Sequence, residues 1–216
     1  MIALGPRTTT QLFENRPEGE SEQDWYRRED VGMAYIADLA CWHLLGEGAW
    51  TTIAGDLSGR RLLDWGCGIA TQALIAARDG ADMYCYEPNP VMREFAEWRA
   101  QKHGLSLTFI DDIAESAEPY DDVVAWHVFE HLEQPENSLD ALLAITKGRL
   151  LTDSGFDDHL PAQHHRHDDW DGSLKSRGLV QVSTCVWVVE GDGSRLVGST
   201  DALSSPSTAE KMAGVA

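Results

Sequence analysis

The stretch LLDWGCGIA, residues 62–70, decides the fold that we expect for this 216-residue chain. An apolar run ends at Trp65, and Gly66 and Gly68 follow it, so the backbone there turns tightly and lets a ligand approach closely. The next residues, IATQALIAARDG at 69–80, have apolar side chains at helical spacing and end in a glycine. The stretch therefore predicts a buried strand, a glycine loop and a helix, in that order.

The same alternation of strands and helices continues along the chain. We predict strands at 60–66, 81–88, 105–110, 121–128 and 148–154, and helices at 69–80, 89–104 and 135–146. Strands that alternate with helices of this length are typical of βαβ units, which form a parallel sheet through right-handed crossovers. The predicted fold class is therefore α/β, with a Rossmann-like, doubly wound sheet that is mostly parallel.

The last part of the chain has a different pattern. A helix is predicted at 168–178, and the run LVQVSTCVWVVE at 179–190 is rich in β-branched residues. The GDG that follows favours a turn into a last strand at 195–200. We therefore expect an antiparallel C-terminal strand or hairpin in the sheet.

The length of the chain suggests one domain. Residues 1–20 are polar and rich in Pro, Gly and Glu, which predicts a flexible N-terminal arm. Residues 21–200 are expected to form a single domain, in which 22–46 fold as a helical cap over the site. The aromatic side chains of this cap either line a substrate pocket or pack in the core. The tail at 201–216, rich in Ser and Ala, is predicted to be disordered.

Composition and charge argue against several classes of function. The formal net charge is −19, and no Lys or Arg occurs between Lys102 and Lys147, so the basic track that nucleic acids require is missing. The apolar runs are shorter than the roughly 20 residues of a membrane span. The N-terminus has no secretory pattern, and the four cysteines match no zinc-ribbon or CxxC spacing, which is typical of a cytoplasmic protein. The acidic surface favours a neutral or cationic small molecule as partner, and the oligomeric state stays open.

Unusual residues gather at the carboxyl ends of the predicted strands, the edge where ligands bind in such sheets. Asp64 lies two residues before the first glycine, and Glu87 lies near the end of the second strand. An NAD fingerprint would need glycine where Thr71 stands, and Asp64 would repel a pyrophosphate. S-adenosyl-L-methionine has no phosphate and carries an ammonium, a carboxylate and a sulfonium, so a neighbouring carboxylate suits it. We therefore predict S-adenosyl-L-methionine as the cofactor.

Four segments together resemble the class I S-adenosylmethionine-dependent methyltransferases, and in particular the subgroup whose fourth-strand signature ends in Glu-His-Leu. They are DWGCG (64–68), the acid in YEPN (86–89), FIDDI (109–113) and YDDVVAWHVFEHL (120–132). The resemblance covers about residues 55–155, with the segments in the order and spacing of the family. The chain departs from the family at Ala70, where a third glycine is common, and in the weakly marked strands of 179–200.

The resemblance implies a role for each matching residue. Asp64 and the glycine loop would hold the methionine end of the cofactor, and Glu87 would accept from the ribose hydroxyls. Asp112 or Asp111 would accept from the adenine amino group, and the end of the fourth strand would flank the cofactor. The cofactor site implied in this way consists of Asp64, Gly66, Cys67, Gly68, Glu87, Pro88, Asp111, Asp112, Ile113, Trp126 and His127.

The stretch HVFEH at 127–131 has the spacing of a zinc-protease signature, which requires a helix. β-branched and aromatic residues dominate 121–129, so we predict a strand there and no protease. Two interpretations remain open. Either the stretch only shapes the cofactor pocket, or His127, Glu130 and His131 bind a divalent metal, with imidazoles favouring Zn²⁺, Mn²⁺ or Fe²⁺ over Mg²⁺. A further ligand would come from the loop that holds His159, His164, His165 and His167.

These residues predict an enzyme that transfers a methyl group from S-adenosyl-L-methionine to an oxygen or nitrogen of a small-molecule acceptor. Histidine suits the removal of a proton near neutral pH, and the candidate catalytic residues are His127, His131 and either His159 or His164. One alternative is a metal-assisted O-methyltransferase that acts on a ribose hydroxyl or a diol. The other is a non-catalytic protein that binds S-adenosyl-L-methionine.

Overall fold

The computed structural model describes residues 8–44, 50–116, 118–152, 164–165, 167, 169–183 and 185–189. Within these ranges one sheet has the strand order β3-β2-β1-β4-β5-β7-β6. The strands are β1 (Arg61–Trp65), β2 (Asp82–Tyr86), β3 (Thr108–Phe109), β4 (Tyr120–Ala125), β5 (Thr146–Thr152), β6 (Leu179–Ser183) and β7 (Val186–Val189). Strands β1 to β5 are parallel, and β7 is antiparallel to both of its neighbours. The predicted α/β class, the mostly parallel sheet and the antiparallel C-terminal hairpin are confirmed.

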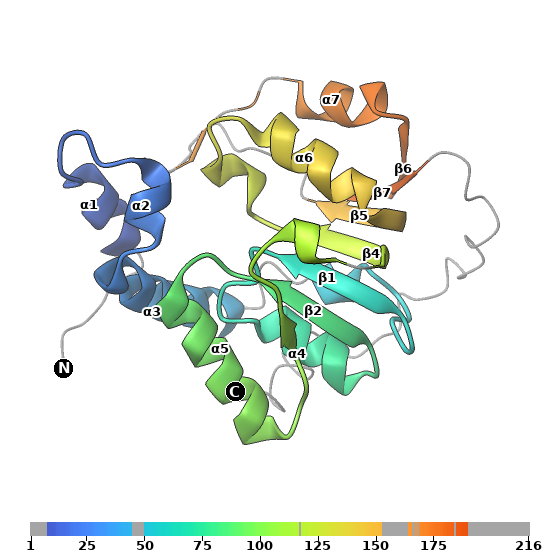
Figure 1. Ribbon diagram of the computed structural model, residues 1–216, viewed down its shortest axis with the longest axis horizontal. Helices are drawn as coiled ribbons and strands as arrows, with labels where there is room; N and C mark the ends of the chain where they lie inside the picture. The colour runs from blue at the N-terminus through green and yellow to red at the C-terminus, as the bar shows by residue number, and fades with distance from the viewer. Residues whose placement is uncertain are drawn as a thin grey trace.

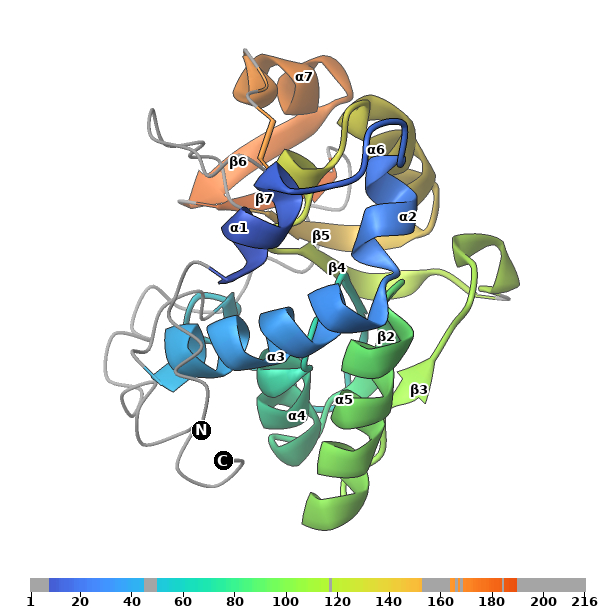
Figure 2. The same cartoon turned by 90° about the vertical axis from the view of Figure 1, so that its left-hand side faces the viewer.

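Helices cover both faces of the sheet (Figure 1). The helices α4 (Thr71–Arg78) and α5 (Pro90–His103) lie on one face, and α6 (Pro135–Ala144) and α7 (Trp170–Ser176) lie on the other. Three N-terminal helices, α1 (Thr8–Glu14), α2 (Glu22–Tyr26) and α3 (Glu29–Leu44), precede the sheet, and α3 packs against α5 (Figure 2). Within the described ranges, no helix has both the length and the apolar character that crossing a membrane requires.

The core lies on both faces of the sheet, which explains why the central strands read as continuous apolar runs. Leu62 and Leu63 are both fully buried, and because successive side chains of a strand alternate, they belong to two different clusters. One cluster, under α6 and α7, includes Phe129, Leu139, Leu150, Trp170 and Trp187. The other, around α4, includes Trp50, Ala73, Met83, Val124 and Leu151. Burial of each large apolar side chain stabilises the fold by about 1.5–3 kcal/mol.

The helix after β2 has the ends that its sequence predicts. The Asn89 side chain accepts from the backbone N–H groups of Val91 and Met92, Pro90 occupies the first turn, and Gly104 ends the helix in the left-handed region with φ 64°. The strand that follows is shorter than predicted, with only two residues in β3. Residues 105–107, the first part of the predicted strand, do not join the sheet. Leu105 and Leu107 instead pack against a small cluster formed by Leu74, Ile75 and Ala100.

The N-terminal segment differs from the expected flexible arm. Residues 8–14 form α1, whose Thr9 donates from its backbone N–H and its hydroxyl to Asp38 of α3 at 3.3 and 2.9 Å. Phe13 packs edge-on against Trp25, with ring centroids 5.0 Å apart. These few contacts order a segment whose composition is typical of flexible chain. Residues 1–7 lie outside the described residues.

The expected helix over 22–46 is divided into α2 and α3. The break lies at Arg27 and Arg28, next to the buried side chain of Asn89. Asn89 Nδ2 donates to the carbonyl oxygens of Tyr26 and Arg28, at 2.5 and 3.0 Å. The side chain that caps α5 thus also binds the carbonyls at the junction of α2 and α3.

The C-terminal hairpin turns earlier than predicted. The β-like run over 179–190 is divided into β6 and β7, with Cys185 at φ 63° between them. The division lets Trp187 pack fully buried opposite Leu150 of β5. The predicted GDG turn, the strand at 195–200 and the tail at 201–216 lie outside the described residues.

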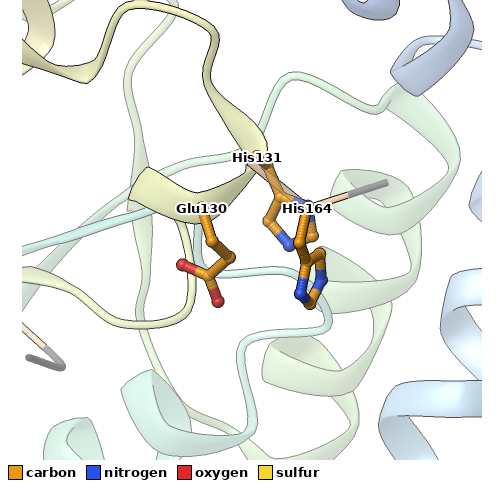
Figure 3. A group of neighbouring side chains, drawn as sticks. All are labelled: Glu130, His131 and His164. Atoms are coloured by element: carbon orange, nitrogen blue, oxygen red, sulfur yellow. The ribbon is translucent and has the colours of Figure 1, made fainter. Parts of the chain in front are cut away.

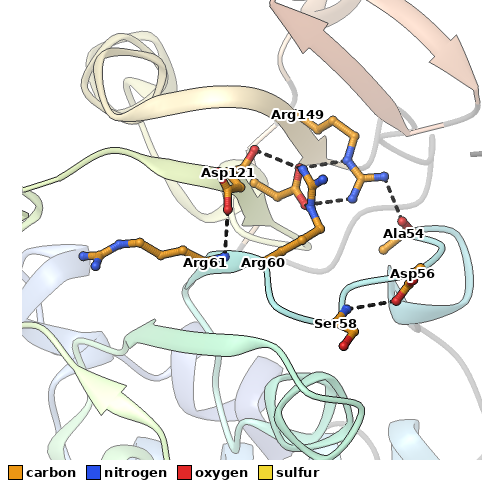
Figure 4. A network of polar contacts seen from close by, with 8 residues as sticks. Ala54, Asp56, Ser58, Arg60, Arg61, Asp121 and Arg149 are labelled. Atoms are coloured by element: carbon orange, nitrogen blue, oxygen red, sulfur yellow. Dashed lines mark hydrogen bonds and ion pairs between the residues drawn. The ribbon is translucent and has the colours of Figure 1, made fainter. Parts of the chain in front are cut away.

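A buried carboxylate joins β1, β4 and β5 at the start of the parallel strands. Asp122 of β4 is fully buried and accepts from Nε and Nη2 of Arg60 at 2.6 and 2.7 Å, and from those of Arg149 at 2.8 and 2.7 Å. Burial alone would raise the pKa of Asp122, but the hydrogen bonds from Arg149 and Arg60 outweigh it and hold the pKa below its usual range. Arg149 also donates to the carbonyl of Ala54 (Figure 4). This network fixes the end of the parallel strands that lies opposite the glycine loop.

Candidate functional site

The loop after β1 adopts a backbone that glycine favours. Gly66 has φ 80° and Gly68 has φ 57°, both in the left-handed region. A Cβ atom at Gly66 would lie 2.6 Å from Val128 Cγ2, and one at Gly68 would lie 2.8 Å from Leu39 Cδ1. The glycine loop is therefore packed between α3 and the segment after β4. Glycine is favoured at both positions because φ is positive there and because a Cβ atom would lie too close to a neighbouring side chain.

Two buried carboxylates lie beside this loop. Asp64 of β1 is 4% exposed, and Glu87, directly after β2, is 8% exposed. Glu87 accepts from the backbone N–H of Gly68 at 2.8 Å and from that of Asn89 at 2.9 Å. The Asp64 carboxylate accepts a hydrogen bond from the indole of Trp50. Because β1 and β2 are neighbouring parallel strands in register, both acids reach the same edge of the sheet.

Burial changes the acidity of both groups. It raises the pKa of Asp64 to about 7, against the Trp50 hydrogen bond, and the charge of Glu87 adds to the rise. It also raises the pKa of Glu87 to about 7, against the hydrogen bonds from Asn89 and Gly68. A positive charge placed beside them would favour their ionised forms. The arrangement therefore suits a cationic ligand and disfavours a phosphate.

Cys67 and Pro88 belong to the same two loops. A hydrogen bond with Cys85 of β2, together with burial, raises the pKa of the Cys67 thiol well above its usual range, so the thiol stays neutral. Pro88 is exposed directly after Glu87.

The three residues predicted around the adenine follow β3. Asp111 is exposed and forms an ion pair with Arg93 of α5. Asp112 is also exposed and accepts from the backbone N–H of Ala114 at 2.9 Å, which caps the short 3₁₀ helix η2 (Ile113–Glu115). Ile113 is half-buried and packs against the core cluster under α6. All three lie after the strand next to β2, and their contact with a cofactor stays a prediction.

Trp126 and His127 continue the chain where β4 ends at Ala125. The indole nitrogen of Trp126 is buried and has no hydrogen-bond partner in the part of the chain that the structure describes, so it can donate to a ligand. His127 has φ 54°, and its side chain is 46% exposed. Its Nδ1 lies 3.2 Å from Glu130 Oε1.

Helix α3 places aromatic and histidine side chains near these residues. Trp42 meets the His127 ring edge-on, with centroids 5.9 Å apart. His43 is half-buried, and burial lowers its pKa to about 4, with smaller effects from Arg99 and His127. Arg99 in turn donates to the Thr71 hydroxyl at 2.7 Å, at the start of α4. The predicted cap thus contacts the glycine loop and its surroundings, and its closure over a cofactor stays a prediction.

The HVFEH stretch is neither a long strand nor the helix of a zinc protease. After β4 ends, residues 129–131 form the 3₁₀ helix η3 (Phe129–His131). Phe129 anchors it, fully buried against Trp65 and Trp170 at centroid distances of 5.9 and 4.6 Å. Because His127 and His131 are not one helical turn apart, the protease geometry is missing, as the β-branched pattern predicts.

Three potential metal ligands converge at η3 (Figure 3). One ligand atom from each of Glu130, His131 and His164 lies within 4.8 Å of the others. The rings of His131 and His164 meet edge-on, with centroids 4.5 Å apart. The structure thus joins two of the predicted metal ligands to a histidine predicted as a further one, whereas His127 contacts Glu130 from outside this group. His159, a predicted catalytic residue, lies outside the described residues.

Helix α2 adds two contacts that the sequence pattern does not signal. The Tyr26 hydroxyl lies 2.5 Å from Nδ1 of His131, and Glu22 Oε2 lies 2.7 Å from Nε2 of His165. The backbone N–H of His165 donates to the carbonyl of Glu130 at 2.6 Å. These bonds hold α2, η3 and the segment after β5 together. Tyr26 and His131 are 105 positions apart, so no local pattern could reveal their contact.

Comparison with known proteins agrees with this geometry. A family model described as a methyltransferase domain matches residues 43–185. The solved structure of magnesium protoporphyrin IX methyltransferase from Synechocystis PCC 6803 with bound SAH has a TM-score of 0.54 and 19% identity, and covers 84% of this chain and 94% of that one. A SAM-dependent methyltransferase from Aquifex aeolicus has a TM-score of 0.56 and 17% identity, and covers 73% of this chain and 97% of that one.

Two curated relatives are similar over a shorter range. A ubiquinone biosynthesis O-methyltransferase from Methylocella silvestris is 34% identical over 113 residues, which are 50% of this chain and 44% of that protein. Its counterpart from Vibrio vulnificus (strain YJ016) is 31% identical over 99 residues, 44% of this chain and 42% of that protein. The chain therefore matches less than half the length of these relatives.

The sheet order, the glycine loop and the paired acids define the class I methyltransferase fold. The chain belongs to the methyltransferase-domain family, as its resemblance to these enzymes predicts. The finer assignment to the Glu-His-Leu subgroup stays a prediction.

Proposed function

We propose that this protein transfers the methyl group of S-adenosyl-L-methionine to a hydroxyl oxygen of a small-molecule acceptor. The observation that carries the proposal is the pair of buried carboxylates, Asp64 and Glu87, beside the glycine loop of a methyltransferase-domain chain. The relatives named as ubiquinone biosynthesis O-methyltransferases support oxygen over nitrogen as the accepting atom. The net charge of −19 supports an acceptor that is neutral or cationic.

The acids and the loop fit the cofactor in a simple way. Asp64 would face the ammonium of the methionine part, and Glu87 would accept from the ribose hydroxyls. Because two backbone N–H groups already hold the Glu87 carboxylate, its orientation is set before a nucleoside arrives. The buried indole N–H of Trp126 gives a further donor at the end of β4.

Methyl transfer then needs alignment and the removal of one proton. S-adenosyl-L-methionine supplies a methyl group on a positively charged sulfur, which is already electrophilic. The protein would have to hold the acceptor oxygen opposite the leaving sulfur. A lone pair of that oxygen would then take the methyl group, the electrons of the broken bond would stay on the sulfur, and the hydroxyl proton would pass to a histidine.

Among the predicted catalytic histidines, His131 has the surroundings of such a base. It is half-buried, and Tyr26, Glu130 and His164 surround its ring. The His127 side chain is nearly half exposed and contacts Glu130. We therefore assign the proton transfer to His131.

A second candidate function is metal-assisted O-methylation, which the convergence of Glu130, His131 and His164 favours. One carboxylate and two imidazoles are a donor set that suits Zn²⁺, Mn²⁺ or Fe²⁺ better than Mg²⁺. A divalent ion held there would lower the pKa of a coordinated hydroxyl. The acceptor would then be a ribose hydroxyl or a diol, which offers two neighbouring oxygens.

Titration calorimetry with S-adenosyl-L-methionine tests the cofactor assignment. We expect Asp64→Ala and Glu87→Ala each to weaken binding at least about tenfold, or roughly 1.4 kcal/mol. Asp82→Ala is the control, because Asp82 is an exposed acid at the opposite end of β2. Unchanged affinity in both site variants would refute the assignment.

Methyl transfer from isotopically labelled cofactor to a panel of phenols, catechols, alcohols and ribonucleosides tests the reaction. Activity that survives a chelator supports His131 as base. Activity that the chelator removes and Zn²⁺ or Mn²⁺ restores supports the metal-assisted reaction. Tight cofactor binding without product on any acceptor would overturn both and leave a non-catalytic binding protein.

A further inference from the structure

Helix α4 begins, fully buried, at a residue that cannot cap it. Its N-cap is Ala70, with φ 54°, which has no side-chain oxygen to accept from the first N–H groups. Ala70 and Ala73 are 0% exposed, and Thr71 is 3% exposed. The first N–H groups of a helix have no partner within the helix, so a buried start without a capping side chain is unusual. Together with the helix dipole, these groups favour an anion.

Gln72, in the first turn of α4, indicates a ligand independently of the backbone. It is 4% exposed, and its Nε2 is buried without a hydrogen-bond partner in the part of the chain that the structure describes. The other end of the amide, Oε1, accepts from the Thr51 hydroxyl at 2.6 Å. So short a distance is typical of an O–H···O bond, which leaves the NH₂ group as the end without a partner. Because helical side chains lean toward the N-terminus of their helix, this donor lies beside the uncapped turn.

Arg99 of α5 brings a positive charge to the same turn. It is 8% exposed, and its Nη1 donates to the carbonyl of Ile69 and to the hydroxyl of Thr71, both at 2.7 Å. Burial lowers the pKa of Arg99, but a guanidinium stays protonated in proteins. The start of α4 thus combines backbone N–H groups, a side-chain donor and a cation, all of which stabilise an anionic ligand.

This start of α4 adjoins the acidic part of the site. The loop between β1 and α4 stays at the ends of the strands, because Gly66 and Cys67 both donate to the carbonyl of Tyr86, at 2.8 and 3.1 Å. Asp64 lies before this loop, and Thr71 lies after it. An α-amino acid carries an ammonium and a carboxylate on one carbon atom, so it matches an acid and an anion site that lie side by side. A free phosphate has no ammonium to offset the charge of the acid.

We propose that the start of α4 binds the carboxylate of the methionine part of S-adenosyl-L-methionine, with Gln72 as the side-chain donor and Arg99 as the nearby positive charge. The inference rests on the proposed function and deepens it, because it adds a site for the carboxylate to the one proposed for the ammonium at Asp64. Thr51 sets the orientation of the Gln72 amide through its hydrogen bond to Oε1. Gln72 is then a residue that selects nucleosides by their carboxylate.

Titration calorimetry of the full chain compares S-adenosyl-L-methionine with its decarboxylated analogue, which keeps the ammonium and the sulfonium. We expect the wild type to bind the analogue at least about tenfold more weakly, as the loss of hydrogen bonds to a charged group predicts. Gln72→Leu keeps the approximate size of the side chain and removes the donor. It should weaken binding of S-adenosyl-L-methionine about tenfold and change the affinity for the analogue by less than about twofold. Gln101→Leu, at an exposed position of α5, is the matched control and should change neither affinity.

Gln72→Glu is a second variant, which places a negative charge where the donor was. It should weaken binding of S-adenosyl-L-methionine more than binding of the analogue, because only the former brings a carboxylate to that charge. Melting curves show whether each variant is folded, and the comparison of the two ligands on the wild type needs no variant.

The two ligands also separate a failure of this inference from a failure of the proposed function. Equal wild-type affinity for both ligands would overturn the inference, and so would equal losses for both in the Gln72 variants, which would indicate a purely structural role. In either case tight binding of S-adenosyl-L-methionine would leave the proposed function in place. If the wild type bound neither ligand, the cofactor assignment itself would fail and this inference with it.

Discussion

At the scale of single residues, Asp64 and Glu87 are held in a place that disfavours their charge. Desolvation of a carboxylate is costly unless hydrogen bonds or opposite charges compensate. The Trp50 indole and the backbone of Gly68 and Asn89 give only partial compensation, so both pKa values stay near 7. A cationic ligand would supply the missing compensation, which makes proton release a signature of binding.

We expect affinity for S-adenosyl-L-methionine to increase with pH. With a pKa of about 7, a carboxyl is ionised to about one tenth at about pH 6 and nine tenths at about pH 8, which predicts roughly tenfold tighter binding for one required charge. Calorimetry across this range measures it. Asp64→Asn, which cannot ionise, should bind more weakly and with a flatter pH dependence. A wild-type affinity that does not change with pH would contradict the assignment.

The same values fix the sign of the effect on stability without cofactor. The pKa of each acid is raised from its ordinary 3.8 or 4.5 to about 7, so the folded chain binds more protons than the unfolded one between these values. The contribution of these acids is therefore fully present below about pH 4 and is lost as pH rises through about 7.

At the scale of elements, one side chain joins three helices. Asn89 caps α5 through its oxygen and binds the carbonyls at the α2–α3 junction through its nitrogen. It is fully buried, and a Cβ at Gly32 of α3 would lie 2.2 Å from its Oδ1. The strand that presents Glu87 is thereby tied to the helices that present Tyr26 and Leu39.

We expect Asn89→Ala to lower the free energy of unfolding by about 2–3 kcal/mol, of which about 1 comes from the cap and the rest from the buried bonds to the carbonyls. Asn89→Ser should lose roughly half as much, because serine can cap α5 but cannot reach Tyr26 and Arg28. Urea unfolding measures both variants. Equal losses in the two would show that the cap contributes nothing, and wild-type stability in Asn89→Ser would exclude a contribution from the junction.

The elements that sequence predicts well are those whose signals are local. Asn89, Pro90 and Gly104 mark the ends of α5 in the local sequence. Asp64 lies in β1 and Glu87 directly follows β2, and both strands carry their own apolar pattern. The order of α1 depends on Asp38 and Trp25, which its own composition cannot reveal. The division of 179–190 depends on how Trp187 packs against β5. Contacts such as Tyr26 with His131 come from the tertiary fold alone.

At the scale of the whole molecule, the sheet order gathers the loops after β1, β2 and β4 at the carboxyl ends of the parallel strands. The Asp122 network fixes the opposite ends of these strands. The surface around this frame is strongly acidic, with 36 Asp and Glu against 17 Lys and Arg. Such an excess of one sign destabilises the compact state through repulsion between like charges.

We expect the melting temperature to rise when NaCl increases from about 0.01 M to about 0.15 M, because the screening length falls from about 30 Å to about 8 Å. Calorimetric or fluorescence-detected melting measures the change. KCl should act like NaCl if screening is the cause. A melting temperature that stays constant or falls in both salts would show that charge repulsion does not limit stability.

The way α3 is held has a consequence for entry to the glycine loop. Its first turns are pinned at Asn89, while Leu39 and Trp42, farther along, contact the loop and His127. A helix of 16 residues is about 24 Å long. A rotation of about 10° around the end held by Asn89 would therefore move the far end by roughly 4 Å. Helix α1 would have to move with it, because Thr9 binds Asp38 in the same half of α3. An opening for an incoming nucleoside would then form under the C-terminal half of α3, while the N-terminal end of the helix stays in place.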